Sequence, residues 1–431
     1  MASFFIPLTG LESDSTALNT IANDLSNMNT TGFKSQNTDF TNLFYQEIGS
    51  TGSGDPIEVG AGVQVASNET NYTQGSINST GNSTDVALNG NGFFVISNGQ
   101  GGYEYTRAGN FTQDTNGNLV TSNGLSVMGY PAVNGVVNTN APLTAINIPV
   151  GQVQEPQATS SLTMTANLDA ASAAGTEFPA EVTVYDSLGE PHTATITYQE
   201  TAPNTWSYSA SLPAADYAGG VAPAPITGSM TFDANGNLTS ITPTGGPAET
   251  VGTAAGDVSS IALDFNPAGS PLADGANDLN INWNLVNSSG TPTISQVDTA
   301  SAVASADANG YASGQYQSFT IGSDGTVTVT YSNGQQQNVG QLALANITNL
   351  QGLQLNGDGD YATTLASGTA AIGTSGTAGL GTLDDGALEA SNVNISSEFS
   401  DLIIAQRAFE ANAKSVTTFD TVTQDTINMV H

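Results

Sequence analysis

The most regular hydrophobic pattern in the chain lies at its C-terminal end, from Leu388 to His431. Apolar residues recur there at two positions of a seven-residue repeat, and no glycine or proline interrupts them. This spacing is typical of one long helix whose apolar stripe is too narrow for a domain core, so the helix needs a partner. The expected seam residues are Phe399, Leu402, Phe409, Ala413, Val416, Ile427 and Val430.

A second seven-residue repeat lies at the N-terminal end, where we expect the partner helix. Its seam residues are Leu11, Leu18, Ile21, Leu25 and Met28. The pattern stops near Gly32, because glycine readily takes the left-handed conformation that ends a helix. Periodicity alone also fits a second interpretation, in which two ordinary amphipathic helices pack on a globular body.

Between the two ends the pattern changes to short alternating strands and tight turns. Residues 182–185 and 194–198 alternate between polar and apolar, as half-buried strands do. Asn-Gly pairs at 116–117, 235–236 and 333–334 supply the positive φ that type I′ hairpin turns require. The sequence predicts a mainly β, multidomain fold with nested β domains inserted between N- and C-terminal α-helices that pair as a coiled coil.

Proline- and glycine-rich stretches indicate where these parts begin and end. The division of the middle into one or two outer domains stays open. The expected parts are a terminal helical coiled-coil domain (1–30 and 391–431), a connecting segment (31–70), a discontinuous inner β domain (71–147 and 297–390) and an outer β domain (148–296).

The charge of the chain is strongly acidic. Four Lys and Arg stand against 38 Asp and Glu, for a net charge of −34. Binding to nucleic acid or to an anionic membrane through charge is therefore not expected. There is no cysteine and no apolar run long enough to insert into a membrane, and we expect no Sec-type signal sequence, because the first residues lack a basic stretch followed by a long apolar one. The basic residues are Lys34, Arg107, Arg407 and Lys414.

Residues for catalysis or cofactor binding are scarce. Neither His192 nor His431 has a partner at metal-site or triad spacing, so we expect no enzyme, no cofactor and no metal site. The segments that begin at Asp114 and Asp233 are similar to calcium loops. They lack the late glutamate of such loops, and hairpin turns already account for them.

Three segments of the chain resemble the bacterial flagellar rod and hook proteins. They are residues 22–34, residues 105–120, and residues 388–394 together with 406–412. Residues 178–198 and 331–346 of the middle resemble the hook proteins of that family. The matching family residues are Asn23, Gly32, Phe33, Lys34, Arg107, Gly109, Asn110, Phe111, Asn392, Arg407 and Asn412.

The resemblance implies a structural subunit of the flagellar hook. Such subunits self-assemble into a curved hollow tube, a universal joint that transmits motor torque to the filament for swimming motility. The terminal helices would line the inner tube. The implied partners are other copies of the chain as a helical homopolymer, the distal rod protein, the hook cap protein, the hook–filament junction proteins and the flagellar type III export apparatus. The implied location is the extracellular hook attached to the basal body.

Two alternatives remain open at this stage. The chain is similar at its ends to distal rod and hook-associated junction proteins, which have related helices. Its acidic, Gly- and Asn-rich composition also fits a secreted calcium-binding adhesin. The paired terminal heptads weigh against the adhesin, because such a module has no need of them.

Overall fold

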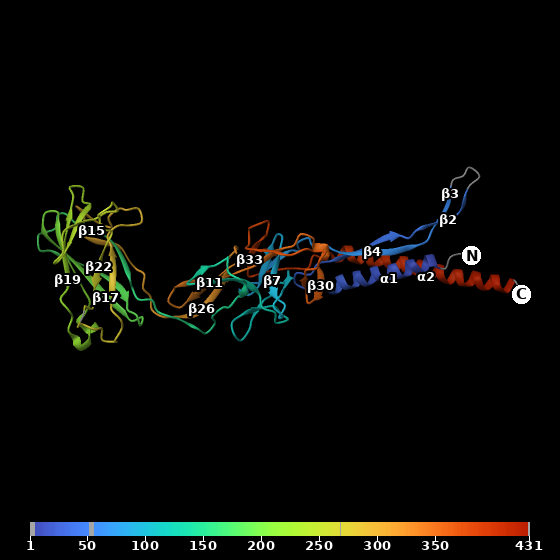
Figure 1. Ribbon diagram of the computed structural model, residues 1–431, viewed down its shortest axis with the longest axis horizontal. Coiled ribbons are helices and arrows are strands. Elements are labelled where there is room, and N and C mark those ends of the chain that lie inside the picture. The colour runs from blue at the N-terminus through green and yellow to red at the C-terminus, as the bar shows by residue number, and fades with distance from the viewer. Residues whose placement is uncertain (1–4, 51–55, 268, 430–431) are drawn as a thin grey trace. The chain divides into compact units, whose positions relative to one another are not determined.

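The computed structural model describes residues 5–50, 56–267 and 269–429. Within them the fold is mainly β, with one helix near each end of the chain (Figure 1). The chain divides into two compact units. Unit 1 contains residues 1–150, 317–330 and 336–431, and unit 2 contains residues 151–316 and 331–335. The expected fold class, β domains inserted between two paired terminal helices, is confirmed.

The two helices are shorter than the sequence pattern suggested. Helix α1 is Phe5–Ser26, and a turn rather than a helix carries Met28. Helix α2 is Ile395–Met429. Its start is fixed by Asn394, whose Oδ1 accepts hydrogen bonds from the backbone N–H groups of Ser396 and Ser397, at 3.0 and 3.3 Å. The preceding Leu388 and Glu389 belong to a strand instead of the helix.

Helices α1 and α2 lie side by side within unit 1 (Figure 1). Asn412 Nδ2 donates a hydrogen bond of 2.8 Å to Asp14 Oδ2 across the pair. Gly10 permits this approach, because a Cβ at that position would lie 2.6 Å from Asn412 Nδ2. The expected pairing of the two chain ends is therefore confirmed.

The segment 31–70, expected to be a simple connection, contains two antiparallel strand pairs. Strands β1 and β4 pair with a bulge after Asp39, and strands β2 and β3 form a second pair. Thr38 on β1 contacts α1 by a hydrogen bond of 3.1 Å to Thr20. Its low apolar content predicted that the segment lies on a neighbouring element, and in the structure β1 and β4 pack on α1. The bounds are β1 (Gln36–Asn42), β2 (Tyr45–Ser50), β3 (Pro56–Gly60) and β4 (Val63–Thr70).

The rest of unit 1 is built from small antiparallel sheets. One sheet has the order β30-β31-β8-β7-β29-β32, another has the order β12-β11-β28-β27-β26 with β13 beside β11, and three two-stranded pairs are β9–β10, β5–β34 and β6–β33. A core of aromatic and small residues, including Phe93, Tyr105 and Tyr361, packs on the first sheet. The bounds are β5 (Ile77–Ser79), β6 (Val86–Asn89), β7 (Phe93–Ser97), β8 (Tyr103–Thr106), β9 (Thr112–Gln113), β10 (Leu119–Val120), β11 (Met128–Val133), β12 (Val136–Val137), β13 (Thr144–Ala145), β26 (Gly314–Ile321), β27 (Thr326–Tyr331), β28 (Gln336–Leu342), β29 (Leu344–Asn346), β30 (Gln354–Gly357), β31 (Asp360–Ala362), β32 (Ala371–Gly373), β33 (Thr382–Asp385) and β34 (Ala387–Glu389).

Unit 2 is a sandwich of two sheets. A six-stranded antiparallel sheet has the order β16-β17-β18-β19-β20-β21, and the other has the order β22-β23-β15-β24 with β25 beside β15. Trp283 from the second sheet contacts Tyr198 and Tyr208 from the first, with ring centroids 6.2 and 5.6 Å apart. The bounds are β14 (Val153–Gln154), β15 (Ser161–Asp169), β16 (Glu177–Tyr185), β17 (Pro191–Ala202), β18 (Thr205–Ser211), β19 (Ile226–Phe232), β20 (Leu238–Pro243), β21 (Glu249–Thr250), β22 (Ser260–Asp264), β23 (Asn280–Asn284), β24 (Ile294–Val297) and β25 (Ala302–Ala308).

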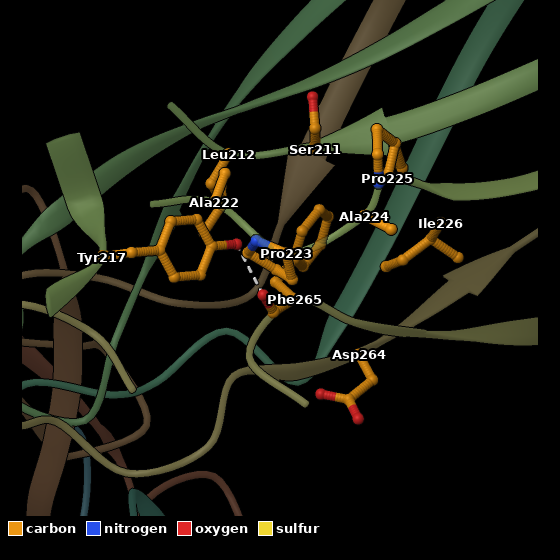
Figure 2. A pocket seen from close by; sticks show the side chains of 11 residues that line it. Ser211, Leu212, Tyr217, Ala222, Pro223, Ala224, Pro225, Ile226, Asp264 and Phe265 are labelled. Carbon is orange, nitrogen blue, oxygen red and sulfur yellow. Dashed lines mark hydrogen bonds between the residues drawn. The ribbon is translucent and has the colours of Figure 1, made fainter. Parts of the chain in front are cut away.

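A loop between β18 and β19 closes over a small crevice of the sandwich (Figure 2). The Tyr217 hydroxyl donates a hydrogen bond of 2.5 Å to the backbone oxygen of Phe265. Burial raises the pKa of Tyr217 to about 12, and the charges of Asp216 and Asp264 act in the same direction. The crevice is lined mostly by aliphatic, aromatic and proline side chains, and we assign it a packing role.

The division between the units differs from the expected domain boundaries. Residues 302–308, expected within the inner β domain, form β25 and pair with β15 in unit 2. The pairing joins positions roughly 140 residues apart in sequence, so local turn signals did not indicate it. Turns are present at the expected Asn-Gly pairs, with φ of 83° at Gly117, 80° at Gly236 and 80° at Gly334. The expected type I′ is wrong, because Asn116, Asn235 and Asn333 do not have the positive φ that this turn requires.

Candidate assembly site

A buried cluster of charged side chains joins the three resembling segments. Glu389 accepts a hydrogen bond of 2.6 Å from Lys34 Nζ at one carboxylate oxygen and one of 3.2 Å from Arg107 Nη1 at the other. All three side chains are buried. Lys34 follows α1, Arg107 follows β8 and Glu389 ends β34, so one carboxylate connects both chain ends to the β body.

Backbone oxygens also accept hydrogen bonds from the two cations. Lys34 Nζ donates to the carbonyl of Thr73 at 2.8 Å, and Arg107 Nη2 donates to that of Gly90 at 2.7 Å. Burial lowers the pKa of both Lys34 and Arg107, and the charge and hydrogen bonds of Glu389 oppose this change. A buried ion pair is costly to break from one side, because the remaining charge has no water to solvate it.

Asn392 connects the start of the C-terminal segment to the N-terminal segment by hydrogen bonds. Its Oδ1 accepts a hydrogen bond of 2.8 Å from the Ser35 backbone N–H, and its Nδ2 donates to the carbonyls of Asn71 and Thr73 at 2.7 and 3.0 Å. One amide side chain therefore satisfies three backbone groups that belong to no regular element. The family position Asn392 has a clear physical role in this junction.

Two glycines of the resembling segments allow close backbone approach. Gly32 has a φ of 68°, and a Cβ there would lie 2.7 Å from the backbone carbon of Arg107. A Cβ at Gly109 would collide with the backbone oxygen of Val86. These positions tolerate only glycine, since the opposing atoms belong to backbone. Phe111, two residues beyond Gly109, is buried with its ring 5.1 Å from that of Phe94.

The expected seam residues lie at different depths in the single chain. Leu11, Leu18, Ile21, Leu25, Leu402, Ala413 and Val416 are half-buried, whereas Met28, Phe399, Phe409 and Ile427 are exposed, and Val430 lies outside the described residues. On α1, small or polar residues at positions 10, 13, 17, 20 and 24 are buried instead of the leucines. On α2, Ala405 is the fully buried position. The intramolecular contact thus uses smaller side chains than the heptad pattern indicated, because α1 also packs against β1 and β4.

A row of large apolar side chains on α2 remains exposed. Phe399 is 52% exposed, Ile403 is 57% exposed and Ile404 is 65% exposed. All residues from 421 to 429 are exposed as well. A helix of 35 residues with so much uncovered apolar surface is typical of one that packs against other helices.

An acidic groove lies between α1, α2 and β1, with a volume of about 550 Å³. Asp24 lies buried close to it, and its Oδ2 accepts a hydrogen bond of 2.8 Å from the Gln36 backbone N–H. Burial raises the pKa of Asp24 to about 6, and it also raises the pKa of Glu398, where the charges of Asp24 and Asp401 add to the effect. The lining residues are Asp14, Ala17, Thr20, Ile21, Gln36, Asn37, Thr38, Asp39, Phe40, Glu398, Asp401, Ile404, Ala405 and Ala408.

Unit 2 contains a charged cluster that the sequence pattern did not reveal. We expected no partner for His192, but its Nε2 lies 3.3 Å from Asp186 Oδ2 and its Nδ1 lies 3.0 Å from Asp216 Oδ2. Asp274 adds a third carboxylate, and its hydrogen bond to Asp186 raises its pKa. Asp186 and His192 belong to the β16–β17 hairpin, whereas Asp216 and Asp274 come from segments distant in sequence, which local spacing did not indicate.

The two loops similar to calcium sites use their aspartates within the turn. Asp114 Oδ1 accepts hydrogen bonds from the backbone N–H groups of Asn116 and Asn118, at 2.8 Å each. Asp233 makes the equivalent bonds to Asn235 and Asn237, at 2.9 and 2.8 Å. Hydrogen bonds from the asparagines lower the pKa of both aspartates. Closing a hairpin turn accounts for these residues.

The remaining family residues are spread over unit 1. Phe33 is half-buried next to Lys34. The backbone of Asn110 forms an isolated antiparallel β-bridge with that of Asp85. Asn23 is exposed and accepts a hydrogen bond of 3.2 Å from Asn27. Arg407 is 78% exposed and forms a surface ion pair of 3.1 Å with Glu410. Neither described helix combines the length and apolar character needed to cross a lipid bilayer.

Comparison with family models identifies the class of protein. The model described as "Flagella basal body rod protein" matches residues 8–34, and "Flagellar basal body rod FlgEFG protein C-terminal" matches 384–429. "Flagellar hook protein FlgE/F/G D1 domain" matches 87–167, and "Flagellar basal body protein FlaE D2 domain" matches 156–311. Helices, inner β body and sandwich together define an axial protein of the bacterial flagellum.

Curated relatives narrow this class. "Flagellar hook protein FlgE" of Treponema pallidum (strain Nichols) is 33% identical and covers 100% of this chain and 99% of its own length. The proteins of the same name from Salmonella typhimurium (strain LT2) and Escherichia coli (strain K12) are 33% and 32% identical, each over 99% of this chain and 100% of their own length. The chain belongs to the flagellar hook protein family, and it is a structural subunit of the hook.

A solved structure supports the fold. The crystal structure of Helicobacter pylori flagellar hook protein FlgE2 superposes with a TM-score of 0.54 and 15% sequence identity, covering 72% of this chain and 100% of that chain. The relatives do not favour a rod or junction protein or an adhesin, the two alternatives that the sequence left open.

Proposed function

We propose that copies of this chain assemble through α1 and α2 into the curved hollow tube of the hook, where they act as a universal joint that transmits torque. The observation that carries this proposal is the uncovered apolar surface of α2, where Phe399, Ile403 and Ile427 are exposed. Within one chain, α1 covers only one side of α2. Helices from neighbouring copies would cover the other side, as in a coiled coil with several strands.

The subunit acts in this proposal through assembly and without catalysis. Its partners are the distal rod protein below, the cap protein during growth and the junction proteins above. The chain leaves the cell through the flagellar type III export apparatus and the growing tube. Outer surfaces rich in Ser, Thr and Asn suit contacts that slide as a bent tube rotates, because polar contacts exchange more readily than large apolar ones.

The test is electron microscopy of the concentrated chain, supplied with short hook fragments as seeds for elongation. A matched variant lacks residues 1–30 and 391–431. Curved tubes that grow from the full chain and no growth from the truncated one are the expected result. Straight tubes would favour a rod-like role, and growth of the truncated chain would exclude the helices as the assembly element.

The truncation needs a control for folding. Trp206 and Trp283 are the two tryptophans of the chain, and both are buried in unit 2. Their fluorescence therefore reports whether unit 2 remains folded when the helices are removed.

A further inference from the structure

The acidic groove of unit 1 carries charge that the single chain does not compensate. Asp14 from α1, Asp39 from β1, and Glu398 and Asp401 from α2 line it, and no lysine or arginine is among its described lining residues. Apolar side chains from the same three elements, such as Ile21, lie between the carboxylates. A ligand that suits this groove presents cations beside apolar groups.

Basic side chains are rare enough in this chain to trace individually. Of the four lysines and arginines, Lys34 and Arg107 are buried against Glu389. Only Arg407 and Lys414 remain, and both are exposed on α2. The ion pair between Arg407 and Glu410 is exposed at both ends, so it contributes little and exchanges readily for another partner.

Arg407 and Lys414 lie on the side of α2 that faces away from the groove of their own chain. Ala405 faces the groove, and at about 100° per residue Arg407 and Lys414 lie roughly 180–200° around the helix from it. Ile403 shares their side of the helix, one turn before Arg407. This side therefore presents two cations and an exposed isoleucine, the chemistry that the groove lacks.

We propose that the Ile403–Arg407–Lys414 side of α2 docks into the acidic groove of a second copy of this chain. The inference rests on the proposed self-assembly and names the contact within it. The two surfaces lie on different sides of one chain, so the contact is heterologous. Such a contact repeats from copy to copy and generates a ring or helical polymer rather than a closed dimer.

Charge reversal tests the contact from both sides. R407E with K414E, and separately D39K with D401K, should each raise the protein concentration needed for seeded elongation at least tenfold, since like charges then face each other. The four substitutions combined restore opposite charges, and elongation should return to within about threefold of wild type. Tubes that form normally from either charge-reversed pair would overturn the proposal, as would a combined variant that recovers nothing.

A matched control separates this contact from net charge. E181K with D298K changes the net charge by the same amount as D39K with D401K, and these exposed residues lie in unit 2, outside the helices proposed for assembly. This variant should elongate like wild type. A loss as large as that of D39K with D401K would assign the effect to total charge and exclude the groove.

Trypsin gives an independent readout on the unmodified protein. The enzyme cleaves after lysine and arginine, so the chain offers four sites, of which the two buried ones should resist. Cleavage after Arg407 and Lys414 should be at least about tenfold slower in tubes than in the free chain, because docking buries these side chains. Equal rates would contradict the contact.

Different results would contradict the proposed self-assembly and the proposed groove contact. If the wild-type chain does not elongate seeds, self-assembly through the helices is wrong, and the groove contact with it. If the wild type elongates and R407E with K414E elongates equally well, self-assembly stands and only the groove contact is wrong.

Discussion

Lys34 Nζ lies 2.6 Å from Glu389 Oε1, although 355 residues separate the two in sequence. The pair is buried, and it closes the chain at the point where both terminal helices leave the β body. Arg107 adds a connection to the intervening β domain. A force applied to either helix is therefore resisted by the charge-assisted hydrogen bonds of this junction, which are stronger than neutral ones.

Substitution of Glu389 tests this junction. Glu389→Ala leaves two buried cations without their carboxylate, so we expect unit 1 to lose about 3–5 kcal/mol of stability. Urea unfolding followed by circular dichroism measures the loss. Glu410→Ala, which removes an exposed ion pair, is the control and should cost at most about 1 kcal/mol. Equal losses in the two variants would contradict a special role for the buried cluster.

Two neighbouring residues on α2 separate folding from assembly. Leu402 is half-buried in the single chain, whereas Ile403 is 57% exposed. Ile403→Asp should leave the stability of the monomer within about 0.5 kcal/mol and abolish tube growth. Leu402→Asp should lower both. Urea titration of the monomer and electron microscopy of seeded samples measure the two effects, and normal tubes from Ile403→Asp would disprove the role of this surface.

Asp24 makes unit 1 sensitive to pH. Its pKa is raised from 3.8 to about 6 by burial, so the folded state favours the protonated form. The resulting stabilisation is full below about pH 4 and is lost as the pH rises through 6. Asp24→Asn keeps an acceptor for the Gln36 N–H and removes this titration, so its stability should change less between pH 4 and 7 than that of wild type. Nearby Glu398 titrates in both proteins, so parallel curves for the two would contradict the assignment to Asp24.

The cluster around His192 stabilises unit 2. His192→Ala removes the imidazole between Asp186 and Asp216, and we expect a loss of about 2–3 kcal/mol, as for hydrogen bonds to charged groups. Tryptophan fluorescence in urea measures it, since both tryptophans lie in unit 2.

The neighbouring Asp274 gives this prediction a control of opposite sign. Its pKa is raised by Asp186, so its ionisation destabilises the fold as the pH rises. Asp274→Asn should therefore be neutral or stabilising at pH 7. If His192→Ala and Asp274→Asn destabilise unit 2 to the same extent, the loss comes from disturbed packing and the electrostatic explanation is excluded.

The sequence alone determined the terminal helices, the β body and the family, because heptad spacing, alternation and Asn-Gly turns are local signals. Tertiary structure decided which side of each helix is covered: α1 packs on β1 and β4 as well as on α2, so small residues such as Gly10 and Ala17 are buried in place of the leucines. It also decided the partners of Glu389 and the contact of His192 with Asp216, since these residues come from distant segments. The family resemblance singled out Lys34 and Arg107, but only the fold shows that they share one carboxylate.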